Sequence, residues 1–388
     1  MKVLLLQSKP FLPVLDGGNE ASRALTKELL ELDYEVEILT FSSEKHPFQR
    51  KEFEAQEWTK LSINHVPINL QTNVSGALSA MLKGNSYNLS RFTHLDWIKK
   101  IQEMKTDFDM VIIDSLYVGQ EIEKIKQQFP KAKIVCRTHN VESHLWRTQA
   151  DNESSILRKK YLTLLVNQLE KREKKILNQV DLILSISEID TGIFNNWGMK
   201  NVHLLPYFPN ISDSISETIS PNFFFMGSMN WQPNILAHNN LTNIILPKLI
   251  KLEKELKMQF AGGHQDQLNK SDSSHIKYLG FVNDKVKFMK ESGILLAPIE
   301  SGSGVRVKLL EALALGVPCV TTSKGAEGIE IKHGEGIFIT QNDEEFVHFA
   351  SQLHQNEDLR KKTGKKAQEN LRKWKTKYNL KDIFEQNL

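Results

Sequence analysis

The sequence predicts an α/β fold in which two domains each carry a parallel sheet. Strand-like and helix-like segments alternate along the 388 residues, and one stretch containing Pro, Ser and Asn, residues 206–222, interrupts the alternation. A chain of this length exceeds one ordinary core and suits two domains of about 150 to 200 residues each. An apolar content of 40% and a charged content of 25% are typical of folded globular proteins.

The first domain is predicted over residues 1–205. A short apolar strand at 2–7 is followed by a loop with Gly17 and Gly18, an amphipathic helix and a second strand at 36–41. Consecutive parallel strands need such a helical crossover, so this order indicates a parallel sheet. Further strands are expected at 110–114, 134–137 and 182–185, and helices at 121–128 and 156–177. The alternation predicts one doubly wound domain.

We treat residues 206–222 as the linker and residues 223–365 as the second domain, where the pattern restarts. Strands are expected at 223–226, 258–261, 277–280, 294–298 and 319–322, and helices at 235–252, 286–291 and 308–315. Residues 366–388 are expected to form a helix that packs back on the first domain. Two facing sheets of this kind would bind ligands in a cleft, at the carboxyl ends of their strands.

Charge and cysteine content exclude several classes of protein. Lysine plus arginine number 50 and aspartate plus glutamate 47, a balance too even for nucleic acid as the main partner. Cys136 and Cys319 stand in apolar runs without the spacing of a metal site or a disulfide framework, so we expect buried thiols in a reducing compartment. No segment approaches the length of about 20 apolar residues that spans a bilayer, and the first residues do not read as a signal peptide.

We therefore expect a cytoplasmic protein. The tail at residues 359–388 is helical in pattern and rich in lysine and arginine. A solvated helix face is the favoured interpretation, and contact with anionic lipid at the inner face of the membrane stays open as the alternative.

The segment at residues 298–318 is the most informative in the chain. A strand ends near Pro298, Gly302 and Gly304 let the backbone approach a ligand, and a helix begins near Val307. A helix amino terminus presents N–H groups and partial positive charge that suit a diphosphate.

Three charged residues follow the glycines of this segment: Arg306, Lys308 and Glu311. The arginine can act as a two-pronged donor and the lysine as a point charge, while the carboxylate one turn on could accept from sugar hydroxyls. The alternative interpretation is a plain turn followed by surface ion pairs.

The stretch GSGVRVKLLEALALGVP from Gly302 to Pro318, with GAEG at 325–328, resembles the donor-site signature of glycosyltransferase family 4. FMGSMNW at 225–231, GFV at 280–282 and RTHNVE at 137–142 add to the resemblance. It implies the GT-B fold, with two Rossmann-like doubly wound parallel-sheet domains facing across a cleft. It further implies retaining, metal-independent transfer of a sugar from a nucleotide diphosphate sugar to a hydroxyl acceptor, with no cofactor besides that donor.

By the same resemblance, Glu311 holds the nucleotide ribose, Arg306 and Lys308 meet the diphosphate, and His139 faces the reaction centre. A capping or core role is the alternative for His139. The catalytic candidates are His139, Arg306 and Lys308. The donor-binding candidates are Gly17, Gly18, Gly227, Ser228, Val282, Glu300, Gly302, Ser303, Gly304, Val305 and Glu311.

The sequence departs from the family pattern at two places. Many members carry a Glu-x7-Glu pair, but the position eight before Glu311 is Ser303, and Glu300 is out of register. Many also carry an arginine and a lysine in the loop that here reads GSMNWQP at 227–233. We therefore expect Arg306 and Lys308 to supply the positive charge. In that loop and just after it, Trp231 and Asn234 are further candidates for ligand contact.

Competing hypotheses remain. A nucleotide-sugar epimerase shares the expected architecture, and a two-lobed sugar-binding protein is the non-enzymatic alternative. A dehydrogenase is disfavoured because Gly17-Gly18 lacks the third glycine of a dinucleotide site. The D-x-D at Asp107 and Asp109 precedes a strand, so we expect a surface loop and no metal site. The acceptor, whether glycan, glycolipid or protein, and the donor base and sugar are not encoded in a recognisable motif, although surface polysaccharide or glycolipid synthesis is expected from the resemblance.

Overall fold

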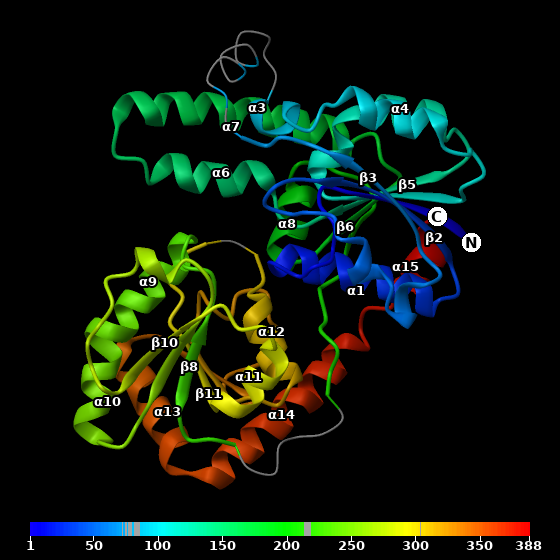
Figure 1. Ribbon diagram of the computed structural model, residues 1–388. Helices are drawn as coiled ribbons and strands as arrows, with labels where there is room; N and C mark the ends of the chain where they lie inside the picture. Colours follow the sequence, from blue (N-terminus) through cyan, green and yellow to red (C-terminus); the bar gives the residue numbers. More distant parts are fainter. Residues whose placement is uncertain (72, 74–75, 77–79, 81–85, 213–218, 303) are drawn as a thin grey trace. The chain divides into compact units, whose positions relative to one another are not determined.

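The computed structural model describes all residues except 72, 74–75, 77–79, 81–85, 213–218 and 303. The chain divides into two compact units (Figure 1): unit 1 comprises Met1–Tyr207 with Tyr378–Leu388, and unit 2 comprises Phe208–Lys377. The first crossing falls inside the expected linker, whose later residues belong to unit 2.

In the described part of unit 1, seven strands form one sheet in the order β3-β2-β1-β4-β5-β6-β7, and all neighbouring pairs are parallel. The strands are β1 (Lys2–Gln7), β2 (Glu35–Ser42), β3 (Ser62–Pro67), β4 (Met110–Asp114), β5 (Lys133–Thr138), β6 (Leu182–Ser185) and β7 (Val202–Leu204). The helices are α1 (Gly17–Glu31), α3 (Tyr87–Ser90), α4 (Leu95–Glu103), α5 (Ile122–Gln128), α6 (Glu142–Asp151), α7 (Ile156–Leu177), α8 (Glu188–Asn196) and α15 (Leu380–Asn387). Short 3-10 turns lie at Arg50–Phe53, Gln56–Trp58 and Leu116–Glu121.

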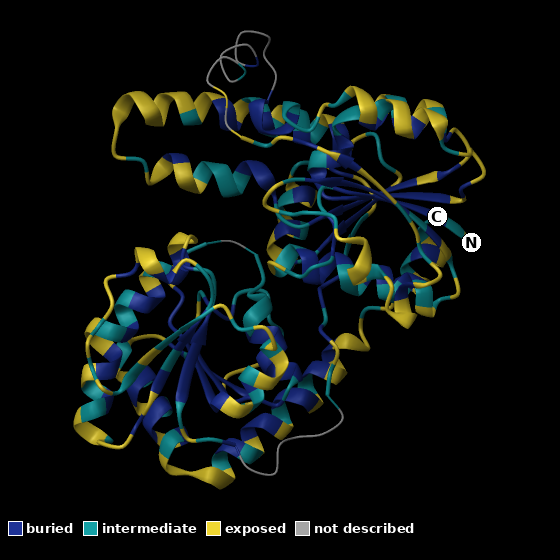
Figure 2. Cartoon of the chain, in the orientation of Figure 1, coloured by how far each residue is buried: buried dark blue, intermediate teal, exposed yellow. Residues whose placement is uncertain are grey.

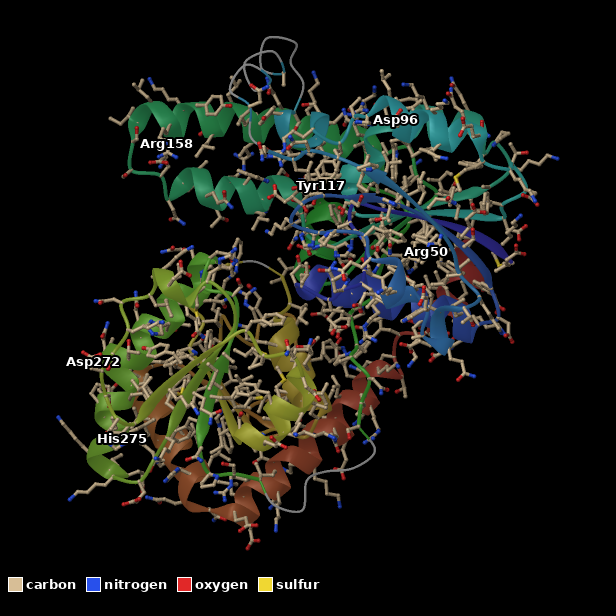
Figure 3. All side chains as sticks on the ribbon, in the orientation of Figure 1. Arg50, Asp96, Tyr117, Arg158, Asp272 and His275 are labelled. Carbon is tan, nitrogen blue, oxygen red and sulfur yellow. The ribbon has the colours of Figure 1, made fainter. Side chains whose placement is uncertain are left out.

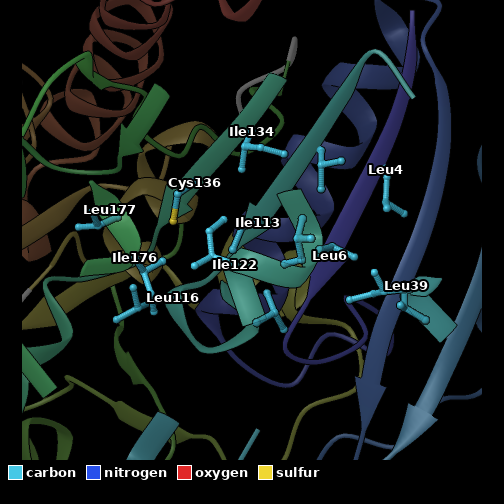
Figure 4. Packing of buried hydrophobic residues seen from close by; sticks show 14 of the residues in the cluster. Leu4, Leu6, Leu39, Ile113, Leu116, Ile122, Ile134, Cys136, Ile176 and Leu177 are labelled. Atoms are coloured by element: carbon cyan, nitrogen blue, oxygen red, sulfur yellow. The ribbon is translucent and has the colours of Figure 1, made fainter. Parts of the chain in front are cut away.

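Both faces of the central strands of this sheet are buried (Figure 2), as a doubly wound sheet requires. Alternate residues of β1 enter different cores: Leu4 and Leu6 pack with residues of α4, α5 and α7, whereas Val3 and Leu5 pack with residues of α1 and α15. Figure 4 shows the first of these clusters at close range.

In the described part of unit 2, six strands form a second parallel sheet in the order β10-β9-β8-β11-β12-β13. The strands are β8 (Phe223–Met226), β9 (Met258–Ala261), β10 (Ile276–Gly280), β11 (Ile294–Ala297), β12 (Cys319–Thr322) and β13 (Ile337–Thr340). The helices are α9 (Gln232–Asn240), α10 (Leu246–Leu252), α11 (Lys285–Ser292), α12 (Val307–Ala314), α13 (Asp343–Gln355) and α14 (Glu357–Lys375). A π-helical turn, Leu241–Ile245, joins α9 to α10, and a 3-10 turn lies at Gln265–Gln267.

The chain returns to unit 1 later than the expected boundary at residue 366. Helix α14 stays in unit 2, where a Cβ at Gly364 would lie 2.1 Å from the carbonyl oxygen of Gly316. Leu371 and Trp374 of the same helix are buried. Only α15 joins unit 1, and there Leu380 and Phe384 enter the core.

The interpretation of Gly17 and Gly18 as loop residues was wrong, because α1 begins at Gly17. Asp16 forms a capping box with Asn19: its side chain accepts from the Asn19 N–H at 3.0 Å, and the Asn19 side chain accepts from the Asp16 N–H at 3.1 Å. No helix in the described residues has the length and apolar character needed to cross a bilayer.

Candidate active site

The strand order of unit 2 reverses direction between β8 and β11, since the chain runs outward to β9 and β10 on one side and to β12 and β13 on the other. Ligands of doubly wound folds bind at such a switch point, at the carboxyl ends of the strands. Gly227 directly follows β8, and residues 298–306 directly follow β11 and lead into α12. The donor-site candidates of unit 2 are therefore concentrated where the topology expects a ligand.

Lys308 lies at the centre of this region. Its Nζ donates to Asn234 Oδ1 at 2.6 Å and stands 4.2 Å from the centroid of the Phe225 ring. The pKa of Lys308 is lowered to about 7, mainly by burial and also by the neighbouring charge of Arg306, while the charge of Glu311 opposes the change. The lysine is thus poised between its charged and neutral forms near neutral pH.

Gly227 is required by this arrangement. A Cβ at residue 227 would stand 2.7 Å from Lys308 Nζ and 2.6 Å from Asn234 Nδ2. The Asn234 amide also donates to the carbonyl oxygen of Ser228 at 2.8 Å. Asn234 therefore fixes both the loop after β8 and the lysine from α12.

Arg306 is the residue that precedes α12, and its guanidinium folds back over the glycine loop. It donates to the carbonyl oxygens of Gly304 at 2.7 Å, Ser301 at 3.2 Å and Gly302 at 3.1 Å. Gly302 and Gly304 have φ values of +94° and +76°, in the region that favours glycine. Arg306 thus shapes the loop in this structure, a role the sequence did not suggest.

Glu311 is buried one turn into α12, and its Oε1 accepts a hydrogen bond from Lys285 Nζ at 2.5 Å. Lys285 is the first residue of α11, and the sequence interpretation missed it because it stands 26 residues before Glu311. Its one sequence signal is its place three residues after Val282, in the turn that the family resemblance singles out.

The remaining candidates of unit 2 differ in their surroundings. Val282 and Val305 are half-buried and Glu300 is exposed. The Ser228 hydroxyl donates to Asn230 Oδ1 at 2.9 Å. Ser303 lies outside the described residues, so its relation to Glu311 is not defined.

In unit 1 the reversal falls between β1 and β4, and His139 lies just beyond the end of β5, the next strand. His139 Nε2 stands 2.7 Å from Asp114 Oδ1 at the end of β4, and Arg137 NH1 donates to the same oxygen at 3.2 Å. Burial opposes ionisation of Asp114, but His139 and Arg137 outweigh it and hold the pKa of this carboxyl below its usual range. A carboxylate only accepts, so Nε2 carries the proton and the ring is oriented.

The turn between His139 and α6 is anchored by a second carboxylate. Glu173 of α7 accepts from the backbone N–H groups of Glu142 at 2.9 Å and Ser143 at 3.1 Å, the first residues of α6. Tyr117 in turn donates its hydroxyl to Glu142 at 2.7 Å, and burial raises the pKa of Glu142 to about 7. These contacts fix the backbone that leads away from the histidine.

Gly17 and Gly18 stand at the amino terminus of α1, which follows β1. Lys9 Nζ pairs with the capping residue Asp16 at 2.6 Å, and a Cβ at Gly18 would lie 3.0 Å from that Nζ. Both carboxylates of the D-x-D motif, Asp107 and Asp109, bond to Lys2. The Lys2 Nζ pairs with Asp107 at 2.8 Å, and the backbone N–H of Lys2 donates to Asp109 at 2.7 Å.

Solved structures share this fold over almost the whole chain. The chain is similar to Anabaena HepE in complex with UDP and glucose, with 12% identity, a TM-score of 0.65, and coverage of 99% of this chain and 97% of that one. It is also similar to TarM of S. aureus, with 12% identity, a TM-score of 0.66, and coverage of 99% and 98%. WaaG, a glycosyltransferase of lipopolysaccharide biosynthesis, has 13% identity, a TM-score of 0.61, and coverage of 100% and 98%. The two doubly wound sheets thus have the GT-B fold, which confirms the predicted fold class.

Residues 220–356 match the family model described as Glycosyl transferases group 1. The matched residues run from just before β8 to just after α13, so the match lies within unit 2 and supports a glycosyltransferase activity. A curated relative, an uncharacterised 44.6 kDa protein in the cps region of Klebsiella pneumoniae, is 27% identical over 268 residues, with coverage of 66% of this chain and 67% of that protein.

Proposed function

We propose that this chain is a member of glycosyltransferase family 4 that moves a sugar from a nucleotide diphosphate sugar to a hydroxyl acceptor, with retention of anomeric configuration and without a bound metal. The observation that carries the proposal is Lys308, held by Asn234 at the β8/β11 switch point beside the amino terminus of α12. A half-buried cation at a helix amino terminus suits a diphosphate.

Each part of the site has a role in this proposal. Lys308 and the N–H groups of α12 neutralise the charge that develops on the departing diphosphate, which is the main electrostatic demand of the reaction. Arg306 shapes the glycine loop around that diphosphate through its bonds to the loop carbonyls. Glu311, oriented by Lys285, accepts from the ribose hydroxyls.

His139 faces the transferred sugar in this proposal. The N–H at Nε2 of His139 donates to Asp114, so Nδ1 is the ring nitrogen that faces the sugar. Gly17 and Gly18, at the amino terminus of α1, contribute backbone N–H groups to the donor site.

The acceptor is a growing surface polysaccharide, a glycolipid or another glycan, and the chain acts in the cytoplasm. HepE has been solved with UDP-glucose, and TarM with UDP and alpha-GlcNAc-glycerol. A relative in a cps region supports the polysaccharide assignment. A uridine nucleotide sugar is accordingly the first donor to test.

A panel of nucleotide diphosphate sugars, read by thermal unfolding, tests the donor site. A donor at a hundred times its Kd stabilises the folded protein by about 2.7 kcal/mol. Lys308→Met is expected to lose this stabilisation, while Lys287→Met, an exposed lysine of α11, keeps it. Equal stabilisation of the two variants would contradict the site.

The reaction itself is tested with the identified donor and candidate acceptors. The anomeric configuration of the product, read by NMR, is expected to equal that of the donor, and activity is expected to survive a metal chelator. Conversion of the donor to a sugar isomer in the absence of acceptor would instead indicate an epimerase.

A further inference from the structure

Helices α6 and α7 form a hairpin that extends beyond the sheet of unit 1 (Figure 1). The carboxyl-terminal half of α7 packs on the sheet, where Leu169, Ile176 and Leu177 enter the core. The amino-terminal half lies farther out, and Arg158 marks its far end in Figure 3.

This outer half carries large apolar side chains in solvent. Ile156 is 72% exposed, Leu157 81%, Tyr161 38% and Leu164 42%. Leu157, Tyr161 and Leu164 follow each other at spacings of four and three residues, so they share one face of the helix. This face is turned away from the stripe that α7 buries, because the buried Val166 and Leu169 lie about 180° and about 120° around the helix from Leu157.

The same face carries positive charge. Lys160 lies three residues after Leu157 and four before Leu164, and Lys171 follows Lys160 by eleven residues, three full turns. Both lysines are exposed. Over its whole length α7 contains seven lysine or arginine residues against two glutamates. Arg158 pairs with Glu153 at 3.4 Å and Lys159 bonds to the carbonyl of Asp151 at 3.0 Å, so these two brace the hairpin turn.

We propose that this exposed face of α7, defined by Leu157, Lys160, Tyr161, Leu164 and Lys171, contacts a lipid bilayer that contains anionic lipid. Helices that lie in a bilayer interface combine apolar side chains with lysines in this way. A lysine stem extends along the apolar surface while its ammonium reaches the lipid headgroups. A protein partner fits less well, because the centres of protein interfaces are depleted of lysine and this patch has one between two leucines.

The tail helix α14 offers no such face. Its large apolar residues Leu371 and Trp374 are buried and Leu359 is half-buried, and none of the exposed large apolar residues of the described chain lies in α14. Its lysines lie on a solvated surface, and Lys361 pairs with Glu357 at 2.9 Å. Of the two basic helices, α7 alone combines charge with exposed apolar area, which is what holds a helix in an interface.

Co-sedimentation of the full-length protein with vesicles tests the proposal. Vesicles of phosphatidylcholine alone are compared with vesicles that also contain phosphatidylglycerol. Binding is expected to the anionic vesicles and to weaken as salt is added. The variant Leu157→Glu with Leu164→Glu is expected to lose binding at every salt concentration. Lys160→Gln and Lys171→Gln are each expected to weaken binding about fivefold at low salt.

Two controls match these variants. Leu95→Glu replaces an 83% exposed leucine of α4, and Lys365→Gln removes a lysine of α14; both are expected to bind vesicles as the parent does. Every variant is also checked for an unchanged melting temperature and unchanged nucleotide-sugar affinity, so that a failed membrane contact is separable from a failed donor site. If the parent does not bind anionic vesicles, or if the double variant Leu157→Glu with Leu164→Glu binds them as tightly as Leu95→Glu, the proposal is wrong. Self-association of the parent without vesicles, abolished by Leu157→Glu, would assign the face to a second copy instead.

Discussion

Donor binding should weaken as pH rises through 7, because Lys308 must be charged to meet a diphosphate. Its pKa in the unliganded protein is about 7, lowered mainly by burial. A bound diphosphate favours the ammonium, so the pKa of Lys308 rises in the complex. About nine tenths of the lysine is charged at pH 6 and about one tenth at pH 8, which makes the affinity about tenfold lower at pH 8. This corresponds to about 1.4 kcal/mol.

Isothermal titration with a nucleotide diphosphate sugar at pH 6, 7 and 8 measures this change. The intact sugar donor is preferable to the free nucleotide diphosphate, since a terminal phosphate itself titrates near pH 6. Repeating the titration in buffers of different ionisation enthalpy should reveal proton uptake that approaches one proton per binding event at pH 8.

Two substitutions separate Lys308 from other titrating groups. Lys308→Met should bind weakly with an affinity independent of pH, and Lys308→Arg should keep its charge and also lose the pH dependence. The reasoning is refuted if the parent shows no change between pH 6 and 8, or if Lys308→Met retains the tenfold change.

Three further outcomes follow from the structure. Gly227→Ala should cost about 1–3 kcal/mol of stability and abolish donor stabilisation, because its Cβ would meet Lys308 Nζ at 2.7 Å, whereas Gly263→Ala, with open space around it, should change neither in thermal unfolding. Asp114→Asn should lower the free energy of unfolding in urea by about 3–5 kcal/mol. That loss of stability should persist down to pH 5. The pKa of Asp114 is lower in the folded than in the unfolded protein, so its carboxylate stabilises the fold fully above the unfolded pKa of about 3.9. This stabilisation is lost only as the pH falls through the folded pKa. Cys136 and Cys319 are buried with raised pKa values, so neither should react with a thiol reagent until the protein is unfolded.

The central strands could be predicted from the sequence, whereas of the edge strands in the described sheets β10 was expected, at 277–280, and β3, β7 and β13 were not. Strands β4, β6 and β8 agree with the prediction residue for residue, because a parallel strand buried on both faces is a continuous apolar run. Strand β3, SINHVP, pairs on one side with β2 and leaves most of its side chains exposed, so it has no such run. Strand β7 is also an edge strand, pairing on one side with β6. It is short and half-buried, so it has no continuous apolar run either.

The candidate site divides along similar lines. Gly302, Gly304, Arg306 and Lys308 lie within seven residues, so one local pattern carries them. Their partners come from elsewhere in the chain: Asn234 is 74 residues from Lys308, and Asp114 is 25 residues from His139. Such pairs depend on which strands lie side by side and in what register, and neither is encoded in a local pattern.

The contacts around Gly227 show how α12 supplies a cation next to a loop, residues 227–233, that has neither lysine nor arginine. A lysine or arginine at residue 227 would need a Cβ where Lys308 Nζ and the Asn234 amide already stand. Glycine at 227 and asparagine at 234 therefore make room for a cation delivered from α12, and they orient it with one short hydrogen bond. In this chain the positive charge beside the loop comes from Lys308 of α12. The consequence is a lysine with a lowered pKa, since the same close packing that positions Lys308 also removes it from water.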